Sequence, residues 1–332
     1  MRAVSGPRSR PQVTRRHDPD VQREDIAGKL PPVSTPYAGQ LAALGTASCW
    51  AASTLAFDAA CRRIGSLVVN ILRLAIAFVL LALACALLRG RALPLDATGH
   101  AWLWLSLSGL VGFGFGDLCL LRGYAFLGPR LSTLMMSLAP PMTALIGWLV
   151  LGERLSPRQL VGMALTVAGI AVAILERPAN GSAPAPRGHR IAGVMLGAGG
   201  ALGQAGGLVL SKLGMGSYDP IAATEVRAIA GIAGYAALFF ALGWWPRVRA
   251  ALADRSALGY TSIGAFFGPF LGVSLSLFAV QRTLSGVAAS LMATTPILII
   301  PAVVLLRGER VGWGGLAGTA VAVGGVALLF LG

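Results

Sequence analysis

Ten long apolar stretches follow one another in this chain, separated mostly by short connections. Each is close to the roughly 20 residues that a helix needs to cross the hydrocarbon core of a bilayer. They do not alternate apolar with polar residues, which excludes the strands of a membrane barrel. The predicted spans are residues 40–58, 66–88, 101–122, 131–151, 157–175, 190–212, 220–243, 257–280, 286–306 and 311–331. The sequence therefore predicts an all-α integral membrane protein with ten transmembrane helices.

Charge is scarce in this chain and lies mostly between the apolar stretches. Charged residues make up 12% of the sequence, against about 25% in an average soluble domain. This excludes an ordinary soluble enzyme, a disordered chain and a coiled coil. The net charge of +14 does not indicate nucleic acid, because membrane proteins keep basic residues in such connections and no nucleic-acid motif is present. The expected partners are the lipid bilayer and a small-molecule substrate, while the oligomeric state stays open.

Two polar segments interrupt the apolar pattern. Residues 1–36 hold seven basic and four acidic residues and have no apolar period, so we expect a disordered basic tail there. Residues 177–189 form a linker rich in proline, glycine and alanine. This linker separates a first five-span half, residues 40–176, from a second five-span half, residues 190–332.

The two halves repeat each other. When residues 128–175 are placed over 284–331, thirteen of the 48 positions are identical. The matched positions include Pro140 with Pro296, Gly152-Glu153-Arg154 with Gly308-Glu309-Arg310, Gly162 with Gly318, and Gly169 with Gly325. Because five is an odd number, the second half must enter the membrane from the opposite side. Inverted repeats are typical of secondary transporters, which hold their substrate at the repeat interface near the midplane.

The shared residues also resemble a known family. A mid-helix proline, then Gly-Glu-Arg, then a glycine-dotted final helix is similar to the pattern of the EamA-type drug/metabolite transporter superfamily, and the resemblance covers residues 40–331. It implies ten helices in two inverted five-helix repeats, export or exchange of small metabolites, and both termini in the cytoplasm. Trp50 in the first span also matches the family, whereas its counterpart Gln204 does not. The family has many substrates, so the resemblance selects none of them.

Charged side chains inside the predicted spans are the sharpest candidates for substrate contact, because each is costly in lipid unless it is paired or hydrated. Arg73 and Arg227 are equivalent when the start of one half is placed over the other. Either they bind a carboxylate or phosphate of the substrate, or they snorkel to the interface or form a structural pair. Asn70 precedes Arg73 by three residues and shares its helix face.

Two carboxylates accompany these arginines. Asp117 follows a glycine run in the third span. It either titrates and couples transport to protons, or it is a structural partner of Arg122 or Arg73. Glu225 lies two residues before Arg227, so the two side chains point to different helix faces and are not expected to pair.

Uncharged side chains complete the candidate substrate site. Trp50, Tyr124 and Gln204 either line a cavity or pack between helices. Lys212 lies near the end of the sixth span, where we expect an interfacial anchor.

Prolines are the candidates for moving parts. Pro140 and Pro296 lie in the middle of the fourth and ninth spans, where a proline removes a backbone hydrogen bond and kinks a helix. The paired kinks either form a gate beside the cavity or are static features of packing.

A Gly-Glu corner follows each of these spans. We expect Gly152 and Gly308 to allow the short turn between two helices. Glu153 and Glu309 are expected to order the corner by interacting with the N-terminus of the next helix.

The sequence contains no motif typical of an enzyme, a metal or cofactor protein, or an ATP-driven pump. The three histidines are not spaced as metal ligands or catalytic bases, and no cofactor, metal or ATP-phosphate motif is present. We therefore expect no cofactor and no metal. The sequence predicts a secondary transporter for amino-acid-like or other amphiphilic or anionic metabolites, working by alternating access in a bacterial cytoplasmic membrane. The alternatives are a non-transporting membrane receptor or scaffold and, less favoured, an intramembrane enzyme.

Overall fold

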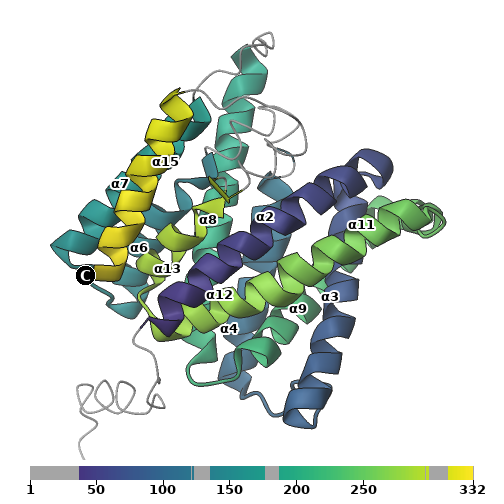
Figure 1. The fold of residues 1–332 in the computed structure, drawn as a ribbon. Coiled ribbons are helices and arrows are strands. Elements are labelled where there is room, and N and C mark those ends of the chain that lie inside the picture. The colour runs from purple at the N-terminus through teal and green to yellow at the C-terminus, as the bar shows by residue number, and fades with distance from the viewer. Residues whose placement is uncertain are drawn as a thin grey trace, which may run out of the picture. The chain divides into compact units, whose positions relative to one another are not determined.

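The computed structural model describes residues 37–120, 122, 135–175, 187–295, 297–298 and 313–331. Within these ranges every regular element is a helix (Figure 1), which confirms the all-α class. The predicted tail and most of the predicted linker lie outside the described residues. Six helical segments are long and apolar enough to cross a membrane: Ser66–Arg89, Gly99–Leu120, Ile191–Met215, Pro220–Leu242, Arg255–Arg282 and Trp313–Leu331.

Helices of the first half follow the predicted spans. They are α2 (Ala38–Ile64), α3 (Ser66–Arg89), α4 (Gly99–Gly109), the π-helical η1 (Leu110–Gly116), α6 (Ala139–Leu151) and α7 (Pro157–Leu175). α2 runs past its predicted end at residue 58 and stops only at Gly65. Gly65 has a φ of +80°, a conformation that side chains disfavour.

Helices of the second half follow in the same order. They are α8 (Arg187–Met215), α9 (Pro220–Leu242), α10 (Trp245–Ala251), α11 (Arg255–Ala265), the π-helical η2 (Phe266–Gly272), α12 (Val273–Arg282), α13 (Ser285–Met292) and α15 (Trp313–Leu331). α8 begins at Arg187, inside the predicted linker. The short α10 was not predicted, because two turns of helix are too short for a hydropathy signal.

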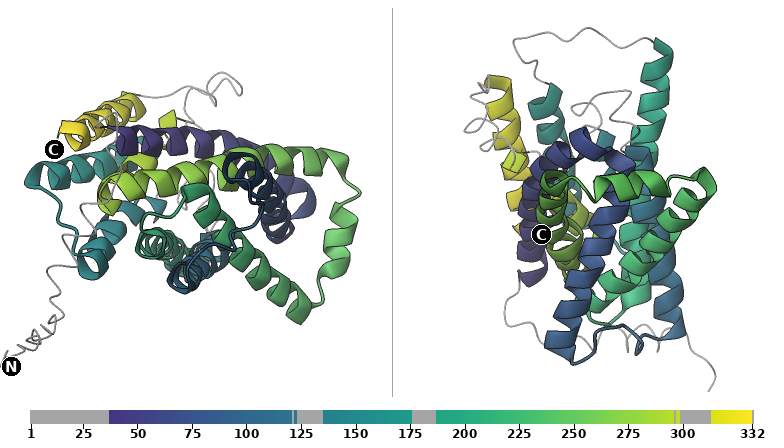
Figure 2. Two further views of the ribbon diagram at one scale, coloured as in Figure 1. Left: turned by 90° about the horizontal axis from the view of Figure 1, so that it is seen from below. Right: turned by 90° about the vertical axis from the view of Figure 1, so that its right-hand side faces the viewer.

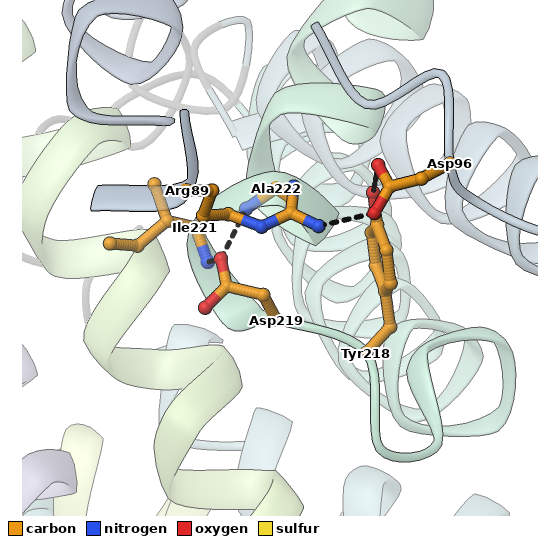
Figure 3. Close-up of polar contacts among 6 residues, drawn as sticks. All are labelled: Arg89, Asp96, Tyr218, Asp219, Ile221 and Ala222. Atoms are coloured by element: carbon orange, nitrogen blue, oxygen red, sulfur yellow. Dashed lines mark hydrogen bonds and ion pairs between the residues drawn. The ribbon is translucent and has the colours of Figure 1, made fainter. Parts of the chain in front are cut away.

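The start of α9 is fixed by its sequence. The Asp219 side chain accepts hydrogen bonds from the backbone N–H groups of Ile221 and Ala222, at 3.1 and 3.0 Å (Figure 3). Pro220 occupies the first turn, where its missing N–H leaves no hydrogen bond unmade. These two signals set the register of the helix that carries two of the candidate charged residues.

One buried apolar cluster joins the halves. It includes Ala43 of α2, Leu105 of α4, Leu277 of α12 and Leu291 of α13, all with no exposed surface. The two views of Figure 2 agree that the purple α2 lies along the yellow-green α12. The halves therefore share a core.

The repeat of the sequence recurs in the structure. The π-helical segments η1 and η2 have 7 residues each and occupy matched positions of the two halves. η1 packs on α8, and η2 packs on α2. A Cβ atom built on Gly116 would lie 3.2 Å from Gly203, and one on Gly272 would lie 2.9 Å from Trp50. The third helical segment of each half thus packs closely on the first helix of the other half.

Equivalent helices of the two halves run antiparallel where they meet. α7 and α15, the last helix of each half, lie side by side in Figures 1 and 2. A Cβ atom on Gly169 would lie 2.4 Å from the Ala322 nitrogen, and one on Gly162 would lie 2.9 Å from the Gly325 oxygen. Rising residue numbers in one helix therefore meet falling numbers in the other, as an inverted repeat requires.

Pro140 does not kink a continuous helix, so this part of the prediction is wrong. The chain turns at residues 137–138, and α6 starts at Ala139 with Pro140 in its first turn, where proline removes no helical hydrogen bond. A matching turn occurs at residues 293–294, after α13. Pro296 itself lies outside the described residues. Helices broken at matching points of two repeats are typical of transporter binding sites.

Candidate functional site

Two buried charges pair at the centre of the candidate site. Arg73 on α3 forms an ion pair with Asp117, the residue that follows η1. Their side chains are 16% and 9% exposed. Of the two structural partners considered for Asp117, the structure places it on Arg73, whereas Arg122 is exposed; the alternative role of Asp117 in proton coupling stays a prediction. The ion pair ties the second helix of the first half to its third segment.

A second arginine lies near the same carboxylate without forming an ion pair with it. Arg227 on α9 is 4% exposed, and Asp117 lies within electrostatic reach of both guanidinium groups. Its guanidinium carbon lies 4.8 Å from the centre of the Phe113 ring. Gly112 leaves room for it, because a Cβ atom there would lie 3.2 Å from an Arg227 nitrogen. The two repeat-related arginines therefore converge on one carboxylate, and we call Arg73, Asp117 and Arg227 the charge cluster.

The charge cluster is incompletely bonded. Among the described residues, the Nε atoms of Arg73 and Arg227 are buried without a hydrogen-bond partner. Two positive groups face one negative group, which leaves one positive charge in excess. Buried charges are stable only when paired and hydrogen-bonded. The arrangement therefore favours an anion with acceptor oxygens as a further partner.

A polar network supports the cluster from α3 and α9. Asn70 donates a hydrogen bond to the Tyr235 hydroxyl at 3.0 Å, and this hydroxyl donates to the Phe113 backbone oxygen at 2.8 Å. Phe113 lies within η1, and π-helical segments often occur at functional sites. The sequence reasoning found Asn70 but missed Tyr235, since a lone tyrosine in an apolar helix looks like a packing residue.

Trp50 and Gln204 occupy matched places beside the two π-helical segments. A Cβ atom on Gly272 would touch the Trp50 ring at 2.9 Å, and one on Gly116 would lie 3.3 Å from the backbone nitrogen of Gln204. Both side chains are half-buried. Gln204 is thus near the residue that precedes Asp117, while Trp50 lies in the corresponding place in the other half.

Glu225 is not part of the charge cluster. It is fully buried in α9, and its ionisable neighbours are Cys85 and Arg89 of α3. As the spacing along α9 predicts, it does not pair with Arg227. The structure therefore separates this candidate from the other buried charges.

The Gly-Glu corner of the first half joins the two halves. Gly152 ends α6 with a φ of +68°, as a short turn requires. The Glu153 carboxylate accepts hydrogen bonds from the backbone N–H of Ser285 at 2.7 Å and from its hydroxyl at 3.1 Å. Glu153 was expected to order the N-terminus of the next helix, α7, but the helix whose N-terminus it binds is α13 of the second half.

Lys212 completes this contact. Its ammonium group lies 2.6 Å from Glu153 Oε1 and donates to the Thr283 backbone oxygen at 2.6 Å. The expected role of Lys212 as an interfacial anchor is therefore wrong, because its charge is used in an ion pair between the halves. We call Glu153, Lys212 and Ser285 the inter-half contact.

Four of the candidates have no described position. Tyr124, Pro296, Gly308 and Glu309 are outside the described residues. Within the part of the chain that the structure describes, no three His, Cys, Asp or Glu residues are grouped so that they could hold a metal ion.

Comparison with known proteins agrees with the repeat. A family model described as the EamA-like transporter family matches residues 37–175 and 191–331. Among solved structures, 28 chains match. One, described only as "Crystal structure of protein", has a TM-score of 0.66 and 21% identity, and the match covers 88% of this chain and 96% of that one, which shows a shared fold. No curated protein matches the chain.

Proposed function

Since the chain belongs to the EamA-like transporter family, we propose that it carries small anionic or amphiphilic metabolites, such as amino acids, across the membrane by alternating access. The family consists of membrane transporters of small solutes, and the apolar helices make this chain an integral membrane protein. The proposed architecture is ten helices in two inverted five-helix repeats. The proposed location is the bacterial cytoplasmic membrane, with both termini in the cytoplasm.

The charge cluster is the observation that carries the choice of substrate class. Two arginines and one aspartate, all largely buried, leave one positive charge in excess. A solute carboxylate or phosphate would supply the missing charge and accept hydrogen bonds from the unpartnered guanidinium atoms. Equivalent helices of the two halves meet there, which is where inverted-repeat transporters hold their cargo.

The substrate class is tested by binding before transport. We expect anionic and zwitterionic amino acids and organic phosphates to raise the melting temperature of the purified protein in a ligand panel, and amines to leave it unchanged. Arg73→Gln and Arg227→Gln should each abolish this shift while the protein still folds. Arg249→Gln is the matched control, because Arg249 is exposed on α10. Stabilisation by amines alone would contradict the assignment.

Saturable flux tests the transport function itself. Proteoliposomes preloaded with the stabilising solute should exchange it with labelled solute outside, and Arg227→Gln should lower this exchange at least tenfold. Binding without flux would instead identify a receptor. A folded protein with neither binding nor flux over the whole panel would refute the proposal.

Alternating access is tested at the inter-half contact. If the halves rock, the Glu153–Lys212 ion pair must open on one side of the membrane. Lys212→Met and Glu153→Gln should each increase thiol labelling of a cysteine introduced at Thr283 in a cysteine-free background, and the double variant should add little further because the two residues form one interaction. Labelling that neither these variants nor added solute alters would contradict rocking at this contact.

A further inference from the structure

Glu225 stands out among the buried carboxylates that the structure describes. It lies about one and a half turns into α9 and has no exposed surface. Neither of its oxygens has a hydrogen-bond partner among the described residues. Asp117 and Glu153, by contrast, are each held by a cation. The function proposed above makes no use of Glu225.

The nearest cation is engaged elsewhere. Arg89 on α3 donates to Asp96 at 2.6 Å, and its guanidinium carbon lies 5.1 Å from the centre of the Tyr218 ring. The Tyr218 hydroxyl donates to Asp96 at 3.0 Å, and Figure 3 shows these three side chains together at the turn before α9. The second guanidinium nitrogen of Arg89, Nη1, is buried without a hydrogen-bond partner among the described residues. Arg89 thus lies between a partly exposed carboxylate that it binds and a buried carboxylate that it does not.

The charge states of Tyr218 and Asp96 keep Arg89 bound to Asp96. Burial raises the pKa of Tyr218 to about 12, so its hydroxyl stays a neutral donor. Burial alone would raise the pKa of Asp96, but the hydrogen bond from Tyr218 and the charge of Arg89 outweigh it and hold this pKa below its ordinary value. Asp96 therefore remains ionised near neutral pH and holds the Arg89 guanidinium away from Glu225.

With Arg89 bound to Asp96, a proton is the cation that can neutralise the Glu225 carboxylate. An ionised carboxylate that is fully buried and accepts no hydrogen bond from the described residues is strongly disfavoured, and such a group takes up a proton instead. A bound metal ion would need several oxygen ligands, and no such group of residues occurs within the described ranges. A proton needs only the carboxylate itself.

We propose that Glu225 is a proton-binding site whose occupancy is governed by Arg89. While Arg89 is held by Asp96, Glu225 carries a proton. When Arg89 turns inward to Glu225, the proton leaves to the solvent at the Asp96 end, Glu225 becomes the negative partner of Arg89, and Asp96 faces water alone. One proton is released and Arg89 stays charged throughout.

This site lies on the same helix as one member of the charge cluster. Glu225 and Arg227 are both on α9, and they contact different neighbours. A movement of α9 that brings solute to Arg227 therefore also moves Glu225 relative to Arg89. The role of the proton in driving flux rests on the proposed transport function, whereas the proton site itself does not.

Infrared titration tests the site without any solute. The full-length protein in bilayers should show a protonated-carboxyl carbonyl band that disappears reversibly as the pH rises. Glu225→Gln should remove this band, and the matched control Glu153→Gln should keep it, because Glu153 is already paired with Lys212. Cys85→Ala should also keep it, because the neighbouring thiol has no carbonyl group and the band belongs to the carboxyl group alone.

Substitution of Asp96, the carboxylate that binds Arg89, tests whether Arg89 governs proton binding at Glu225. Asp96→Asn frees Arg89 to turn inward, so the band should disappear at lower pH than in the unsubstituted protein. A band unaffected by Glu225→Gln, or one that does not titrate, would overturn the proton site. A band whose midpoint is unchanged by Asp96→Asn would overturn the control by Arg89.

Flux under an imposed pH gradient tests the coupling separately. Glu225→Gln should retain solute exchange at equal pH but lose gradient-driven accumulation. If Glu225→Gln still accumulates solute under the pH gradient, Glu225 does not couple proton movement to flux. The infrared titration then decides separately whether Glu225 binds a proton. If the unsubstituted protein shows no flux at all, the transport proposal fails, and the infrared titration still decides whether Glu225 binds a proton.

Discussion

Two adjacent glycines in α15 provide an internally controlled test of how closely the halves approach. Gly325 is buried against α7, whereas Gly324 is exposed. A Cβ atom on Gly325 would lie 2.5 Å from Thr166 Oγ1, 2.6 Å from the Thr166 nitrogen and 2.7 Å from the Gly162 oxygen, but one on Gly324 would meet nothing within 4 Å. Two of the three close atoms belong to the backbone, so rotation of a side chain cannot relieve the clash. The perturbation is therefore alanine at each position in turn.

The expected effects have opposite signs. Ordinary contact begins near 3.4 Å, so Gly325→Ala must push α7 and α15 apart by close to 1 Å. Overpacking of this kind costs about 1–3 kcal/mol. Alanine in place of a helix-interior glycine stabilises by about 0.5–1 kcal/mol at either position. Gly325→Ala should therefore lose up to about 2 kcal/mol, and Gly324→Ala should gain up to about 1 kcal/mol.

Unfolding in mixed micelles at increasing denaturing-detergent concentration measures both variants against the unsubstituted protein. Gly169→Ala is the repeat-related counterpart and should behave like Gly325→Ala, because its Cβ atom would lie 2.4 Å from the Ala322 nitrogen. Equal stability of the Gly324 and Gly325 variants would refute the close antiparallel contact. So would destabilisation by Gly324→Ala alone.

Two further predictions concern single side chains. The backbone N–H of Ala257 and then the Arg63 guanidinium bind the Asp254 carboxylate and lower its pKa, so this carboxylate stabilises the fold above its unfolded-state pKa of about 4 and the effect is lost as pH falls below that value. The difference in melting temperature between the unsubstituted protein and Asp254→Asn should accordingly be largest near neutral pH and shrink below about pH 4; a difference that grows on acidification would contradict this sign. Tyr235→Phe should cost about 1–3 kcal/mol, because it removes the hydrogen bond to the Phe113 oxygen and leaves the buried Asn70 amide without its acceptor. Tyr260→Phe is the control, since Tyr260 is 43% exposed, and an equal loss in both would argue against the buried hydrogen bond.

Hydropathy and the internal repeat predict most of the fold. The predicted span 157–175 has the same bounds as α7. The glycines that the repeat matches, Gly162 with Gly318 and Gly169 with Gly325, are the residues at which α7 and α15 come into closest contact. The π-helical form of η1 and η2 was not predicted, because a glycine-rich apolar sequence does not choose between hydrogen bonds four and five residues apart. In the folded chain, the π-helical η1 packs on α8 and the π-helical η2 packs on α2.

The sequence identifies the charged residues of the candidate site but not which of them form ion pairs with one another. A charge is costly in the membrane wherever it lies, so Arg73 and Asp117 are visible in the sequence. Their pairing depends on how helices cross, and Asp117 bonds to Arg73 on another helix rather than to Arg122 five residues later. The same holds for Lys212, whose partner Glu153 comes from the other half of the chain. Sequence spacing predicts partners only along one helix.

The two halves agree where they pack and differ where they carry negative charge. The counterpart of Asp117 in the second half is Val273, which lies in a buried apolar cluster with Phe113 and Tyr235. The arginines, by contrast, are kept in both halves. An aspartate in both would give two cations and two anions, a cluster already neutral with no charge to offer a solute. Because only one half supplies the carboxylate, one positive charge remains, and on the proposed function the anionic solute provides its partner. On the proposed function, the departure from the repeat, rather than the repeat itself, therefore sets the charge of the solute that the protein carries.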